Sequence, residues 1–177
     1  MRAYRLRQVK REIRVLGIAV GCAEGGEGLH VVGVVFRGGL WLDGVMRTEA
    51  EGPDVTGEAV EMIAASPHHP QIRVVLLDRE LIGGGATIRP CGLSSGVSRP
   101  VIAINFDRAD CPAVGEAVHG ITIEKGGAPT QVLIVGLSSQ VALRVLRTAS
   151  REEATPEALR VAELAISALT EAGHHNL

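Results

Sequence analysis

VVGVVFRGGLWLDGV, residues Val31–Val45, predicts two apolar strands joined by a tight turn at Arg37-Gly38-Gly39. Glycine readily adopts the positive φ angles that such a hairpin needs. The second strand carries one carboxylate, Asp43, among apolar residues. A charge in a strand is costly unless it faces water or has a partner. Asp43 is therefore expected to be either a structural carboxylate or one that faces a substrate.

Outward from this hairpin, the apolar pattern predicts a β-meander followed by alternating helices and strands. Ile72–Leu77 is a continuous apolar run, which is typical of a strand buried on both faces. We expect the glycine-rich segment Ile82–Ser98 to form a long loop, with at most a short helical turn. The predicted strands are Glu12–Val20, Leu29–Phe36, Leu40–Arg47, Ile72–Leu77, Val101–Phe106 and Gln131–Val135. The predicted helices are Val55–Ala65, Asp110–Val118, Ser139–Ala149 and a last helix from about Pro156 to Ala172.

The length of 177 residues predicts one domain, residues 1–177, with a sizeable core. No apolar run approaches the roughly 20 residues of a membrane span, so we expect a cytoplasmic protein without membrane contact. The net charge of −2 does not favour nucleic acid, but segment 1–14 is basic. That segment either contacts phosphates or is a solvated edge strand. Its basic residues are Arg2, Arg5, Arg7, Lys10, Arg11 and Arg14.

Three cysteines, Cys22, Cys91 and Cys111, are widely spaced along the chain. The absence of a Cys-x-x-Cys pair argues against a structural zinc site. We expect buried free thiols, because intracellular disulfides are rare outside hyperthermophiles.

Several of these segments resemble the archaeal endonuclease dU family, also called domain-of-unknown-function family ninety-nine, a distant relative of endonuclease V. The resemblance covers most of the chain and is weak in Ile82–Ser98 and Cys111–Thr130. It implies an α/β, ribonuclease H-like fold, with a mixed sheet of an antiparallel meander and then parallel strands, and helices on both faces. The segments that carry it are RVLGI (Arg14–Ile18), VGVVFRGGLWLDGV (Val32–Val45), DVTGEAVEMI (Asp54–Ile63), QIRVVLLD (Gln71–Asp78), PVIAI (Pro100–Ile104) and PEALRVAELAISA (Pro156–Ala168).

The resemblance also implies a Mg²⁺ or Mn²⁺ site, built from carboxylates at neighbouring strand ends. The family pattern continues after the first strand with an aspartate pair, but this chain has Ala19 and Val20 there. Neither residue can bind a metal. The family positions that remain acidic are Asp78, at the end of its strand, and Asp54 or Glu58, at the start of the helix that follows the β-meander. The alternative explanation of Asp78 is that it is a helix-capping or turn aspartate after a buried strand, without a metal to bind.

Three functions remain open on these grounds. The sequence favours a catalytically degraded nuclease homologue that retains binding to nucleic acid, DNA or RNA, or to a protein partner, with Arg37, Arg5, Arg7, Lys10 and Arg11 on phosphates. The alternative is a Mg²⁺-dependent endonuclease that acts on deaminated bases in DNA. It would use Asp54 and Asp78, with a loop acid such as Glu24 or Glu27 as the missing ligand. The third is a homo-oligomeric scaffold without catalytic activity.

Overall fold

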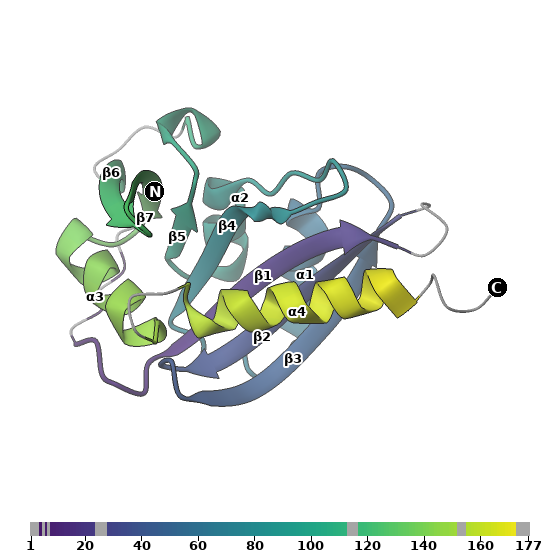
Figure 1. Cartoon of the computed structure of the whole chain (residues 1–177), viewed down its shortest axis with the longest axis horizontal. Coiled ribbons are helices and arrows are strands. Elements are labelled where there is room, and N and C mark those ends of the chain that lie inside the picture. Colours follow the sequence, from purple (N-terminus) through teal and green to yellow (C-terminus); the bar gives the residue numbers. More distant parts are fainter. Residues whose placement is uncertain are drawn as a thin grey trace.

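A seven-stranded mixed sheet forms the centre of the computed structural model (Figure 1), which describes residues 4, 6, 8–23, 28–112, 117–151 and 155–172. The strands are β1 (Arg14–Cys22), β2 (Leu29–Arg37), β3 (Trp41–Ala50), β4 (Val74–Ile82), β5 (Val101–Ile104), β6 (Val118–Lys125) and β7 (Ala128–Val135). The helices are α1 (Thr56–Ala65), α2 (Pro90–Val97), α3 (Ser139–Ala149) and α4 (Glu157–Ala172), with a short 3-10 turn at Arg108–Asp110.

The strands lie in the order β3-β2-β1-β4-β5-β7-β6. The meander β1-β2-β3 is antiparallel, β4 and β5 run parallel to β1, and the hairpin β6-β7 adds an antiparallel edge. The expectation of a meander followed by parallel strands is therefore confirmed. The carboxyl ends of β1, β4 and β5 meet at one edge of the sheet, where ligands bind in open α/β folds.

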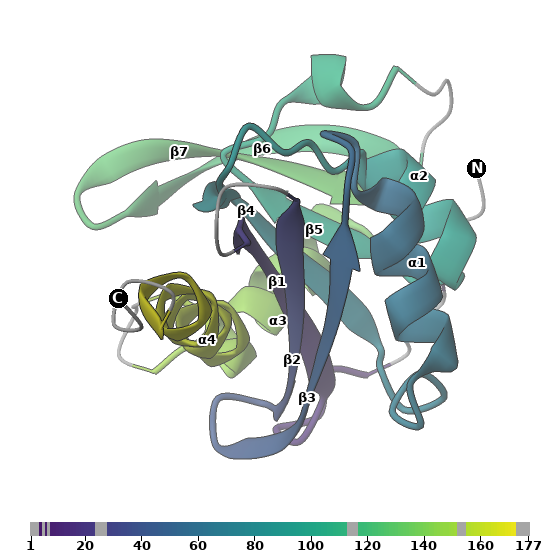
Figure 2. The same ribbon diagram turned by 90° about the vertical axis from the view of Figure 1, so that its right-hand side faces the viewer.

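Helices cover both faces of the sheet, as expected (Figure 2). Helices α1 and α2 pack on one face, which we call the α1 face. Helices α3 and α4 pack on the other, the α4 face. Helix α4 lies very close to β1 at Gly17. A Cβ added to this glycine would sit 2.5 Å from the carbonyl carbon of Ala158. Within the described part of the chain, no helix is long and apolar enough to cross a membrane.

The turn between β2 and β3 needs its first glycine. Gly38 has a φ of 58°, and a Cβ there would overlap the carbonyl oxygen of Arg11. The Gly38 N–H also donates to the carbonyl of Ile13 at 2.7 Å. The turn therefore packs directly against the segment that precedes β1.

Asp43 is paired, which accounts for a carboxylate in the apolar strand β3. Its oxygens accept hydrogen bonds from Arg14 Nε at 2.6 Å and from Arg37 Nη2 at 2.8 Å. Burial alone would raise the pKa of Asp43, but the bonds from Arg37 and Arg14 outweigh it and hold this pKa below its usual value. The ion pairs connect β1, β2 and β3, so Asp43 has a structural role.

Two element predictions were wrong. The predicted loop Ile82–Ser98 contains α2, which begins with a proline in its first turn, a position that proline favours. The predicted helix Asp110–Val118 is not formed at either end, because Asp110 closes a 3-10 turn and Val118 opens β6; residues 113–116 lie outside the described residues.

The prediction of buried free thiols also failed. Cys91 on α2 and Cys111 after the 3-10 turn form a disulfide, with their Cα atoms 5.6 Å apart. Cys22 is a free thiol but is exposed. The disulfide joins α2 to the segment after β5, which fixes part of the sheet edge.

We predict that Gly38→Ala destabilises the protein by about 2 kcal/mol, because alanine at positive φ is strained and its Cβ meets the Arg11 carbonyl. Urea unfolding measures this loss. Gly57→Ala is the matched control, because a Cβ at this exposed helical position meets no atom and should stabilise α1 slightly. Equal stability of Gly38→Ala and the natural protein would contradict the packing described for the turn.

The pairing of Asp43 makes stability depend on pH. Because the pKa of Asp43 is lowered in the folded state, its contribution is present above its unfolded pKa of about 3.9 and is lost as pH falls through the folded pKa. Asp43→Asn should lower stability at pH 7 and reduce the loss of stability on acidification. Urea midpoints from pH 7 to pH 3 measure both effects, with the exposed Glu61→Gln as control. An unchanged pH profile in Asp43→Asn would count against this role.

Candidate site at the carboxyl end of strand β4

Asp78 is a buried carboxylate in the middle of β4, opposite the last residue of β5, so the expectation that it ends its strand was wrong. Its exposed fraction is 3%, and it pairs with Ile104 of β5. Its Oδ1 accepts hydrogen bonds from Asn105 Nδ2 at 2.8 Å and from the backbone N–H of Glu80 at 3.2 Å. Its Oδ2 accepts a hydrogen bond from Lys125 Nζ at 3.3 Å. Both oxygens of the carboxylate are therefore occupied by donors from this chain.

Asn105 reaches Asp78 because the backbone turns sharply after β5. Its φ is 61°, in the left-handed region that asparagine tolerates better than most residues. The main chain of Asn105 is held on both sides: its N–H donates to the carbonyl of Gln131 at 2.8 Å, and its carbonyl accepts from Arg79 Nε at 2.9 Å. These bonds fix the amide group toward Asp78.

Lys125 is the last residue of β6, and a tight hairpin holds it near Asp78 of β4. Gly126 and Gly127 connect β6 to β7 with φ angles of 59° and 79°. Two positive φ angles in a two-residue loop are the conformation of a type I′ turn, which suits the strand twist. The Lys125 side chain is 26% exposed, so its ammonium contacts both Asp78 and solvent.

Sequence reasoning missed Lys125, because β6 was not predicted. A signal was present: apolar Ile121 and Ile123 alternate with Thr122 and Glu124 before the glycine pair. That pattern is typical of a strand leading into a hairpin.

Ala19 of β1 and Asp78 of β4 lie where the register between these two strands shifts. The last paired residues before it are Ile18 of β1 and Leu77 of β4. Ala19 is fully buried and packs on the α4 face, to which Asp78 also points by strand alternation. Val20 packs on the opposite, α1 face. Of the two positions that are acidic in the family pattern, Ala19 is the one on the same face of the sheet as Asp78.

Asp54 and Glu58 do not join Asp78. Asp54 lies before α1, which covers the other face of the sheet. Its Oδ1 accepts from Thr56 Oγ1 at 2.6 Å and from the Thr56 N–H at 3.1 Å, and its Oδ2 pairs with Arg89 at 2.8 Å. These bonds, the Thr56 hydroxyl first, lower the pKa of Asp54. Glu58 lies in the first turn of α1, where an acid favours the helix dipole.

These residues do not fit the divalent cation that the family pattern implies. Mg²⁺ needs six oxygen ligands in near-octahedral geometry. Here the Asp78 oxygens accept three donors, one of them a cation, and Ala19 offers no ligand. Among the residues that the structure describes, no three His, Cys, Asp or Glu side chains are grouped to hold a metal. Glu24 and Glu27, the predicted loop substitutes, lie outside the described residues.

The predicted phosphate contacts divide into three groups. Arg37 forms an ion pair with Asp43, whose hydrogen bond raises the pKa of Arg37. Lys10 lines a groove of about 650 Å³ beside the start of β1, and Arg11 lines a separate hollow near the β2–β3 turn. Arg5 and Arg7 lie outside the described residues.

A cleft of about 860 Å³ lies beside the Asp78–Lys125 pair. The β6–β7 hairpin projects beyond the sheet on the side of α3 and α4 and forms one wall (Figure 2). The cleft combines apolar groups, two basic side chains and one carboxylate, Glu124. Its lining includes Ile104, Ile123, Lys125, Leu146, Arg147 and Pro156.

Comparison with known proteins identifies the family and the fold of the chain. A family model described as endonuclease dU matches residues 11–124. The chain belongs to the endonuclease dU family. A UPF0215 protein of Methanopyrus kandleri is 35% identical over 189 residues, with 94% of this chain and 95% of the relative covered. A UPF0215 protein of Methanothermobacter thermautotrophicus is 32% identical, with 96% and 94% covered.

Solved structures share the fold of this endonuclease dU family member. A protein of unknown function from Archaeoglobus fulgidus has a TM-score of 0.70 at 22% identity, with 89% of this chain and 98% of that chain covered. Human endonuclease V has a TM-score of 0.64 at 17% identity, with 98% and 91% covered. Endonuclease V of Ciona intestinalis, in complex with DNA that contains an inosine, has a TM-score of 0.60 at 12% identity, with 94% and 89% covered. The fold is therefore the ribonuclease H-like fold of endonuclease V, as the sequence predicted.

The poor fit to a metal leads to a reconstruction experiment. In Ala19→Asp/Lys125→Ala, a second carboxylate lies on the same face of the sheet as Asp78 and the competing ammonium is gone, so we expect Mn²⁺ binding with a dissociation constant below about 1 mM by calorimetry. Val20→Asp/Lys125→Ala is the matched control, because Val20 lies on the opposite face. Circular dichroism checks that both variants fold. Equal Mn²⁺ binding by the natural protein would contradict the poor fit.

Proposed function

We propose that this protein is a nucleic-acid-binding member of the endonuclease dU family that has lost metal-dependent cleavage. The observation that carries the proposal is the contact of the Lys125 ammonium with Asp78 Oδ2, on the sheet face where Ala19 is also buried. In a metal-dependent nuclease, the cation activates a water and stabilises the charge that develops at the cleaved phosphodiester. This chain places an ammonium on the carboxylate that would hold that cation.

The electrostatics of the pair support the loss of cleavage. A carboxylate that is 3% exposed needs a counter-charge, because an unpaired buried ion costs several kcal/mol. Lys125 supplies one positive charge, and Asn105 and the Glu80 N–H complete the shell. The site is then neutral. A divalent cation would have to displace the ammonium and find its remaining ligands elsewhere.

The surroundings of the pair support nucleic-acid binding. The cleft beside Asp78 carries Lys125 and Arg147 on its walls. Lysine and arginine bind phosphates by charge, whatever the base sequence. The endonuclease V of Ciona intestinalis, which shares the fold, has been solved with DNA. Loss of the metal removes the chemistry of such a cleft but leaves its basic walls.

Cleavage and binding assays on the same DNA test the proposal. We expect no cleavage of uracil- or hypoxanthine-containing DNA with Mg²⁺ or Mn²⁺. We expect binding of single- or double-stranded nucleic acid that weakens steeply with salt, because counterions are released from the phosphates.

Two results would overturn the proposal. Metal-dependent cleavage that Asp78→Asn abolishes would establish the alternative, an endonuclease for deaminated bases. Absence of any nucleic-acid binding, together with a stable oligomer in sedimentation, would favour the scaffold protein.

A further inference from the structure

Six arginines of the described residues form an ion pair with a carboxylate. Such ion pairs are Arg14 and Arg37 with Asp43, Arg47 with Glu49, Arg79 with Asp110, Arg89 with Asp54, and Arg160 with Glu157. Arg11 and Arg147 do not: among the described residues, neither side chain has a hydrogen bond or an ion pair, which is also true of Arg73 and Arg144. Both side chains are exposed. Their positive charge is therefore available to a ligand.

These two arginines meet a third at one concave place. Arg11, Arg147 and Arg151 line a hollow of about 380 Å³, together with Gly39 and Leu40 of the β2–β3 turn. The close packing of Gly38 against Arg11 brings the first arginine to the turn. Helix α3 supplies the second in its last turn, and the chain just after α3 supplies the third.

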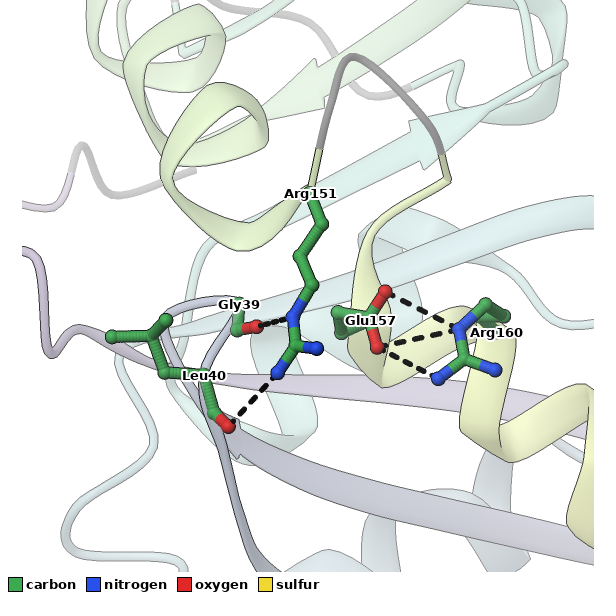
Figure 3. A network of polar contacts seen from close by, with 5 residues as sticks. All are labelled: Gly39, Leu40, Arg151, Glu157 and Arg160. Carbon is green, nitrogen blue, oxygen red and sulfur yellow. Dashed lines mark hydrogen bonds and ion pairs between the residues drawn. The ribbon is translucent and has the colours of Figure 1, made fainter.

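Arg151 is held in a fixed orientation (Figure 3). Its Nε donates to the carbonyl of Gly39 at 2.6 Å, and its Nη2 donates to the carbonyl of Leu40 at 3.2 Å. A guanidinium has five N–H donors, so Arg151 keeps donors for a ligand. Glu157, the carboxylate drawn nearby in Figure 3, is buried and already paired with Arg160 at 2.8 Å. It does not neutralise Arg151.

The charge balance of the hollow favours an anion. Among the residues that the structure describes, its lining contains three guanidinium groups and no carboxylate. The carboxyl end of α3, which ends at Ala149, opposes an anion with about half an elementary charge. Three full positive charges exceed this. Guanidinium groups bind phosphate through paired hydrogen bonds, so a phosphate group is the matching ligand.

The hollow is continuous with the cleft beside Asp78. Arg147 and Ser150 line both, and Lys125 lies on the cleft wall. We infer that the hollow of Arg11, Arg147 and Arg151 binds a backbone phosphate of the nucleic acid whose strand runs through the cleft. This inference rests on the proposed function and names the phosphate contacts that it requires. It assigns the phosphate contacts to Arg11, Arg147 and Arg151 in place of Arg37, whose charge is already balanced by Asp43.

A charge-reversal pair tests the inference. Arg11→Glu/Arg147→Glu changes two exposed side chains without described polar contacts, so the fold should persist. Arg47→Glu/Arg73→Glu makes the same change in net charge at exposed positions that do not line the hollow. Binding of a fluorescent 20-nucleotide single strand and of its duplex is measured by anisotropy over a range of salt. Inorganic pyrophosphate, as a competitor, reports whether phosphate alone occupies the hollow.

We expect Arg11→Glu/Arg147→Glu to weaken binding at least tenfold in 0.1 M salt. Losing the one phosphate held in the hollow should reduce the slope of log K against log salt by about 0.7 for single strands and about 0.9 for duplex. The control pair should lose much less, and pyrophosphate should compete with the strand for the natural protein.

Each contrary result has a separate meaning. If the natural protein binds DNA and Arg11→Glu/Arg147→Glu binds it equally well, the hollow does not bind a phosphate of the nucleic acid, and the proposed function stands. An equal loss of affinity in the control pair would show that net charge alone explains the effect, and would refute phosphate binding in the hollow. If the natural protein binds no nucleic acid, the proposed function and the hollow both fail, even if pyrophosphate binds.

Discussion

A carboxylate buried in the middle of β4 has to be neutralised, and the rest of the candidate site is organised around this need. Asp78 is bonded by an amide that follows β5, by a backbone N–H of its own strand and by a lysine at the end of β6. The glycine turn after Lys125 and the left-handed Asn105 both serve to bring these donors within reach. The hairpin that delivers the lysine also forms a wall of the adjacent cleft. The pairing of Asp78 with Lys125 therefore determines the charge of the site and, through the β6–β7 hairpin, the shape of the adjacent cleft.

The sequence was sufficient for those parts of the fold in which local pattern and burial agree. The apolar runs of β1, β2 and β4, the twin-glycine turn and the bounds of α3 were all placed correctly, because each depends on neighbouring residues. Helix α2 and strand β6 were missed. Helix α2 contains glycine, proline and serine, whose intrinsic helix propensity is poor, and tertiary packing overrides this. Strand β6 carries a weak alternation at the sheet edge.

The candidate site was only half predictable for a related reason. Asp78 and the alanine at position 19 can be read from the sequence, but Lys125 is 47 residues from Asp78 and meets it only in the folded chain. Asp54 looked equivalent to Asp78 in the sequence. In the structure its oxygens bind Thr56 and Arg89 on the other face of the sheet. The Cys91–Cys111 disulfide depends equally on long-range contact.

The positions of Ala19 and Lys125 relative to Asp78 have a consequence for how such a site can change over generations. With the lysine present, an acid at residue 19 gains no cation to share with Asp78. With the acid absent, loss of the lysine leaves Asp78 buried without a counter-charge. Neither single substitution is favourable, so each residue protects the other against reversal. If the proposed function holds, the two positions are coupled by sign epistasis, because either single substitution toward a metal-binding arrangement leaves a buried charge without a partner.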